Sequence, residues 1–141
     1  MRTMAIVDAD NAVVGRLASI VAKRLLQGEE IIIVNAEKAV IVGNKSYIIE
    51  KYKERRDIGS VRKGPYYPRM PDRILRRTIR GMLPMKKSHG KEAYKKLKVY
   101  MGVPRELQGK EFEIIEDAKN NKLEGFITLR DLSIQLGAKL R

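Results

Sequence analysis

The chain has 141 residues, with 30 Lys and Arg against 17 Asp and Glu and a formal net charge of +13. This length suits one domain, and 43% hydrophobic residues are enough for a core, which argues against a fully disordered chain. Cysteine is absent, which excludes disulfides and thiolate metal sites, and no apolar run of about 18 residues predicts a membrane span. The short apolar start is no secretory signal, so we expect an intracellular protein.

The first third of the chain predicts a strand, a helix and a strand in that order. Residues 4–7 form a short apolar run that ends in turn residues, and residues 31–34 are typical of a strand buried on both faces. Residues 40–42 are a further strand candidate, and Gly28 is typical of the position after a helix. The helix between the strands at residues 4–7 and 31–34 is indicated by apolar residues at helical spacing, namely Val14, Leu17, Ala18, Val21 and Leu25. This order predicts an α/β layered domain with parallel strands.

The middle of the chain predicts two helices around a loop. The first helix is expected over residues 46–56, and residues 59–71 read as a loop because they are rich in Gly, Pro, Tyr and basic residues. Asp72 is a candidate N-cap for a second helix over residues 73–83, which Pro84 would stop.

The last third carries weaker signals. We expect a short helix over residues 91–98, a strand over residues 99–101 and another over residues 112–115. Residues 128–131 have the spacing of a capping box, and Leu129, Leu132 and Leu136 share a face before Gly137, so a short helix is expected there. Altogether the sequence predicts a single α/β domain over residues 1–141, with a C-terminal tail at about 105–141.

The positive charge is confined to one internal block. Residues 45–98 hold 18 Lys and Arg against 5 Asp and Glu, whereas the other 87 residues hold 12 of each kind. The whole excess therefore lies at about residues 45–98, and a polyanion is the expected partner of this block.

One helix face within the block is the sharpest feature. Arg73, Arg76, Arg77 and Arg80 fall within about 100° of one another, while Leu75, Thr78, Ile79 and Met82 lie opposite. A solvated face normally mixes both signs, and like charges at this spacing are destabilising. The face therefore favours contact with phosphates, which guanidinium groups bind bidentately; a merely solvated face is the alternative.

Two loops extend this basic surface. Residues 62–69 combine cations with aromatic rings, namely Arg62, Lys63, Tyr66, Tyr67 and Arg69. Such rings stack on unpaired bases, although either Tyr could instead anchor the loop. The second loop contributes Lys86, Lys87, His89 and Lys91, and the block also contains Lys45, Arg55 and Arg56. His89 is the only histidine, and it is expected to be a surface donor.

An enzyme is the main alternative of another class. Asp8 and Asp10 follow a strand, where paired carboxylates can hold Mg²⁺ or accept a phosphoryl group. No Gly-rich phosphate-binding pattern occurs, however, and Asp8 to Asn11 are explained more simply as turn formers. We therefore expect no catalytic residue, metal site, cofactor or small-molecule substrate. The arginine helix also lacks the broad apolar face that membrane binding needs.

Several segments resemble the ribosomal protein L13 family. They are residues 79–84, 90–91 and 97–102, together with residues 14–19, 34–38 and 43–45. The loop at residues 62–71 is similar to the archaeal and eukaryotic branch. The resemblance implies a three-layer α/β/α domain with a small, mostly parallel sheet, in a protein that is not an enzyme.

The same resemblance implies a role in the cytoplasm, in the ribosome. The chain would be a structural protein of the large subunit that supports assembly and translation, with large-subunit rRNA and neighbouring ribosomal proteins as partners and no membrane contact. It implies RNA contact for Arg80, Lys86, Lys87, His89 and Lys91. A regulatory mRNA binder outside the ribosome is an alternative that the same basic surface would support.

Overall fold

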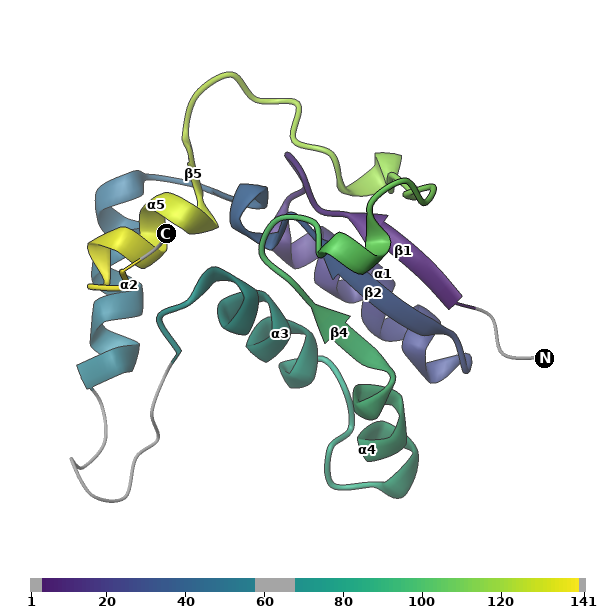
Figure 1. The fold of residues 1–141 in the computed structure, drawn as a ribbon. Helices are drawn as coiled ribbons and strands as arrows, with labels where there is room; N and C mark the ends of the chain where they lie inside the picture. Colours follow the sequence, from purple (N-terminus) through teal and green to yellow (C-terminus); the bar gives the residue numbers. More distant parts are fainter. Residues whose placement is uncertain (1–3, 58–67, 140–141) are drawn as a thin grey trace.

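A three-stranded parallel sheet lies at the centre of the molecule (Figure 1). The computed structural model describes residues 4–57 and 68–139. The strands are β1 (Met4–Asp8), β2 (Glu30–Val34) and β4 (Leu97–Val99), in the order β1-β2-β4. The β-branched run of β2 takes the middle position, where both edges of the strand are paired. The expected α/β class with a small, mostly parallel sheet is confirmed.

The main core joins one face of this sheet to buried residues within 48–52 and 127–136 and to three helices. They are α1 (Val14–Leu26), α3 (Pro71–Gly81) and α4 (Ser88–Lys95). Alternate strand residues belong to this core because successive side chains of a strand point to opposite faces. The sheet contributes Val7, Ile31, Ile33 and Leu97, which are at most 2% exposed.

The other face of the sheet has a thinner cover. Ile6 and Val34 form a small second cluster with Leu107, which comes from the short 3-10 helix Arg105–Leu107. Val103 and Phe112 pack against this cluster, to which none of the described α-helices contributes. The third layer implied by the resemblance is therefore made by a 3-10 turn and irregular chain, and it leaves Ile32 half-buried.

A second, two-stranded unit lies beside the main sheet. Strand β3 (Val40–Val42) pairs antiparallel with β5 (Phe126–Thr128). In the chain, α2 (Lys45–Asp57) follows β3, and α5 (Leu129–Gln135) follows β5. The Thr128 hydroxyl accepts a hydrogen bond from the Asp131 backbone N–H at 3.2 Å, which confirms the expected capping interaction at the start of α5.

The segment between β4 and β5 is fastened to the N-terminal part. Glu113 donates its backbone N–H to Ile6 and accepts from Asp8, at 2.7 and 2.9 Å. Its carboxylate binds the Arg24 guanidinium, which also binds Glu29, with nitrogen–oxygen distances of 2.6 to 3.3 Å. The hydrogen bonds that Arg24 donates to Glu29 and Glu113 raise the pKa of Arg24, and the bond from Arg24 lowers the pKa of Glu29.

Several expected boundaries are corrected by the structure. Helix α3 begins at Pro71 with Met70 as N-cap, so Asp72 is not the cap; proline suits the first helical position because its φ is already set. Helix α4 covers Ser88–Lys95 and β4 covers Leu97–Val99, each slightly earlier than expected. Residues 112–115 form no strand, because only Glu113 makes a single bridge, to Val7.

Candidate nucleic-acid interface

Helix α3 is held by one face and presents arginines on the other. Its buried residues are Pro71, Ile74, Leu75 and Ile79. Met82, expected on this buried side, is instead the C-cap residue and is 43% exposed, because the helix ends at Gly81. The arginine face, defined as Arg73, Arg76, Arg77 and Arg80, has three exposed members and a half-buried Arg80. The expected grouping of these four side chains is confirmed.

The arginine face is concave rather than flat. Its four arginines line a hollow of about 300 Å³ together with Pro68 and Tyr94 of α4. The Arg76 guanidinium lies over the Tyr94 ring, 4.7 Å from the ring centre, in a cation–π contact. This contact restrains the guanidinium plane at the wall of the hollow.

Most of the arginines on this face have no carboxylate partner among the described residues. Within the described ranges, Arg73, Arg76 and Arg80 form no ion pair, and Asp72 is the one acidic residue on α3. Guanidinium groups held together without counter-charges repel one another, so the arrangement is stabilised when anions bind.

The basic surface continues from α3 to the edge of the sheet. A second hollow of about 360 Å³ lies between α3 and β4, and it shares Arg73 and Arg76 with the first. Lys98 and Tyr100 also line it, and Asp72 is the one acidic residue in its lining. Tyr94, Lys98 and Tyr100 were not among the expected contact residues, since their place beside the arginines depends on how α4 and β4 pack on α3.

The second basic loop is held in place at Gly90. Lys86, Lys87, His89 and Lys91 are all exposed, on the turn after α3 and the first residues of α4. Gly90 is buried between them, and a Cβ at this position would collide with the backbone carbonyl of Pro84. The helix can approach the preceding turn this closely only because residue 90 has no side chain.

The remaining expected residues are more dispersed. Lys45 is exposed at the start of α2, and the Arg55 guanidinium lies 5.0 Å from the centre of the Tyr52 ring on the same helix. Arg69 is exposed just before α3. Five expected residues lie outside the part whose side chains are described, namely Arg56, Arg62, Lys63, Tyr66 and Tyr67.

The paired aspartates act as turn residues. Asp8 Oδ1 accepts hydrogen bonds from the Asp10 backbone N–H and from Asn35 Nδ2, both at 3.0 Å. Asp10 is exposed, and over residues 4–57 and 68–139 no group of three His, Cys, Asp or Glu could hold a metal ion. The interpretation of these residues as turn formers is therefore supported. In the same ranges no helix is both long and apolar enough to cross a membrane.

These features define a small α/β protein with a concave, one-signed arginine surface and no assembled catalytic site among its described residues. Residues 2–106 match the family model described as ribosomal protein L13. The chain belongs to this family, as the sequence resemblance predicted. It is therefore a ribosomal protein with a structural role in the cytoplasm, and not an enzyme.

Curated relatives agree with the family match. The chain is 56% identical over 135 residues to large ribosomal subunit protein uL13 of Archaeoglobus fulgidus, which covers 94% of this chain and 86% of the relative. It is 56% identical over 134 residues to the protein of the same name from Thermoplasma acidophilum, with 95% and 98% covered. The relative from Methanococcoides burtonii is 51% identical over 138 residues, with 96% and 99% covered.

Proposed function

We propose that the chain is a structural constituent of the large ribosomal subunit that binds large-subunit rRNA through the arginine face. The observation that carries this proposal is the hollow lined by four arginines, three of which have no acidic partner in the described part of the chain. Arginine forks match the geometry of phosphate oxygens, and folded RNA brings phosphates close together. The chain would act as one domain, with residues 45–98 as its RNA-binding part.

Phosphate contacts would supply the affinity, and RNA shape would supply the specificity. Deep, narrow A-form grooves keep side chains away from most base edges, so a rigid protein surface recognises how the RNA backbone folds. The α/β body provides that rigidity, since α3 is fixed by Ile74, Leu75 and Ile79, all fully buried. The protein would thereby support subunit assembly and translation.

The exposed basic residues next to the arginine face would widen the contact. Lys86 and Lys87 lie on the turn that follows α3, and His89 and Lys91 lie in the first turn of α4. Lys45, Arg55 and Arg69, together with the five expected residues outside the described side chains, complete the proposed RNA-contacting set. Neighbouring large-subunit proteins are the second class of proposed partner.

Sedimentation of cell lysate tests this function. A tagged copy of the full chain should sediment with large subunits at low salt and leave them only at high salt, because phosphate contacts weaken steeply as salt rises. The control is the same tag on an unrelated soluble protein, which should remain at the top of the gradient. A chain that stays at the top at low salt, or sediments with mRNA-containing fractions free of large subunits, would contradict the proposal.

A further inference from the structure

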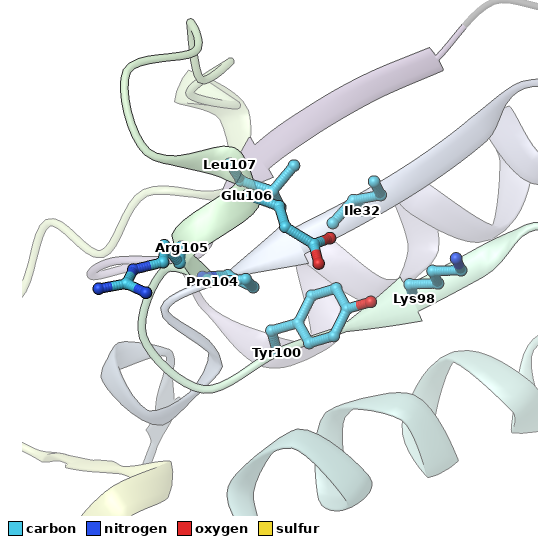
Figure 2. A pocket seen from close by; sticks show the side chains of 7 residues that line it. All are labelled: Ile32, Lys98, Tyr100, Pro104, Arg105, Glu106 and Leu107. Atoms are coloured by element: carbon cyan, nitrogen blue, oxygen red, sulfur yellow. The ribbon is translucent and has the colours of Figure 1, made fainter.

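A third hollow lies on the thinly covered face of the sheet. Strand β4, at the edge of the sheet, separates it from the arginine face. The volume of this hollow is about 290 Å³, and Figure 2 shows the side chains that line it. They are Ile32, Lys98, Tyr100, Pro104, Arg105, Glu106 and Leu107, and we call this site the Tyr100 hollow.

The walls of this hollow combine apolar surfaces with a carboxylate. Ile32, Pro104 and the Tyr100 ring form apolar surfaces, and Tyr100 is 36% exposed. The Glu106 carboxylate is directed into the same space as the Tyr100 ring, whereas Arg105 points away from it (Figure 2). An open aromatic ring beside a carboxylate suits a flat ligand with N–H groups on one edge.

The hollow is the end of a basic track. It shares Lys98 and Tyr100 with the hollow between α3 and β4, which in turn shares Arg73 and Arg76 with the arginine face. A further hollow of about 210 Å³ adjoins it at Ile32 and Lys98, and it adds Lys95 and Lys96 together with one acidic residue, Glu30. This surrounding charge favours an anionic chain over a cationic peptide, although a cationic side chain could also pair with Glu106.

We propose that the Tyr100 hollow binds one unpaired guanine of the RNA that the arginine face holds; this inference rests on the proposed function. The base stacks on the Tyr100 ring, its N1–H and N2–H groups donate to the Glu106 carboxylate, and the Lys98 ammonium lies by the neighbouring phosphate.

Guanine is chosen because of the chemistry of Glu106. An ionised carboxylate only accepts hydrogen bonds, and it accepts two when adjacent donors face it. Guanine presents two adjacent N–H donors on its Watson–Crick edge. Adenine and cytosine each place a ring-nitrogen acceptor beside the amino group, and uracil places carbonyl oxygens on both sides of its single N–H. These acceptors would face the carboxylate without a proton between them.

Labelled RNA pentamers UUXUU test the inference, with X as guanine, adenine, cytosine, uracil or inosine. In fluorescence anisotropy with the full chain at low salt, we expect the guanine pentamer to bind about tenfold more tightly than the uracil pentamer. Inosine, which lacks the N2 amino group, should fall between them. Glu106→Gln should abolish the preference, and Tyr100→Leu should weaken guanine binding about tenfold through lost stacking.

Control variants separate this site from the arginine face. Glu124→Gln removes the same charge from an exposed position away from the hollow and should keep the preference. Arg76→Glu should weaken all pentamers alike. Thermal melting of the Glu106→Gln and Glu124→Gln variants should match the wild type, since both side chains are exposed.

Several outcomes would overturn the inference. They are equal binding of all pentamers, no binding of any pentamer, a guanine preference that survives Glu106→Gln, GMP competing as well as the guanine pentamer, or tighter binding of an arginine-rich peptide. If rRNA binding falls on reversal of the arginine face while the pentamers are not distinguished, the proposed function stands and the guanine site is wrong.

Discussion

Gly90 has a packing role that substitution tests directly. Alanine at this position would push a methyl group into the Pro84 carbonyl, and neither backbone segment can move without disturbing the start of α4. We expect Gly90→Ala to lower the free energy of unfolding by about 1–3 kcal/mol, as overpacking typically does. Urea unfolding followed by circular dichroism measures the change.

Gly81 provides the matched control for Gly90. It lies at the last position of α3, and a Cβ there would meet open space. Gly81→Ala should be neutral or stabilising by up to about 1 kcal/mol, because alanine favours helix. A Gly90→Ala protein as stable as the Gly81→Ala protein would contradict the packing argument.

The Arg24 cluster predicts a pH dependence. Arg24 lowers the pKa of Glu29 below its ordinary value of 4.5, so this carboxylate stabilises the fold above that pH and loses its contribution as the pH falls below it. Arg24→Met should therefore cost about 1 kcal/mol at about pH 7 and clearly less at about pH 3.

Urea unfolding of the wild type and Arg24→Met at the two pH values checks this sign. Lys23→Met is the control, since Lys23 is exposed on the same helix and takes part in no ion pair within the described residues. A wild-type advantage that is the same at both pH values would show that the Glu29 interaction does not depend on its charge.

At the scale of elements, α5 depends on its cap. The Thr128 hydroxyl accepts a hydrogen bond from the Asp131 backbone N–H. A helix of only seven residues has few other hydrogen bonds to stabilise it. We expect Thr128→Ala to cost about 1 kcal/mol of unfolding free energy and Thr128→Ser to restore most of it. A serine variant as unstable as the alanine variant would mean that lost methyl packing, not the hydrogen bond, is responsible.

Elements with a strong local pattern were predictable from the sequence. The β-branched run of β2 and the apolar stripe of α1 each identify their element, because burial selects the same residues that the pattern displays. Strand β5 was missed, since its three residues carry no period and become a strand only by pairing with distant β3. The α4 boundary was misplaced because Gly90 reads as a break in sequence, whereas packing against Pro84 makes it a helical residue.

The candidate site divides in the same way. The arginine face was predictable because helical spacing alone places the four side chains together. The contributions of Tyr94, Lys98 and Tyr100 were not, since they reach the hollows only through the packing of α4 and β4 on α3. Local periodicity therefore identified the helix face, and tertiary packing determined the shape of the surface around it.

At the scale of the molecule, the net positive charge and much of the hydrophobic core lie in different parts of the chain. Residues 45–98 carry the entire net charge of +13, while the flanking segments are neutral in sum. The neutral segments contribute β1, α1, β2 and most of the second unit, so much of the core can form without bringing cations together. Most of the repulsion therefore falls on the elements that are proposed to meet RNA.

The most direct measurement is the affinity of the chain for large-subunit rRNA fragments across a range of salt concentrations. We compare the wild type with Arg76→Glu/Arg77→Glu and with Lys23→Glu/Arg130→Glu, which makes the same change in net charge at exposed positions outside the basic block. The arginine-face variant should bind at least about a hundredfold more weakly at moderate salt, with the salt slope reduced by about 1.5, whereas the control should change little. Equal losses in the two variants, or unchanged binding by the arginine-face variant, would contradict the claim that this face binds the RNA.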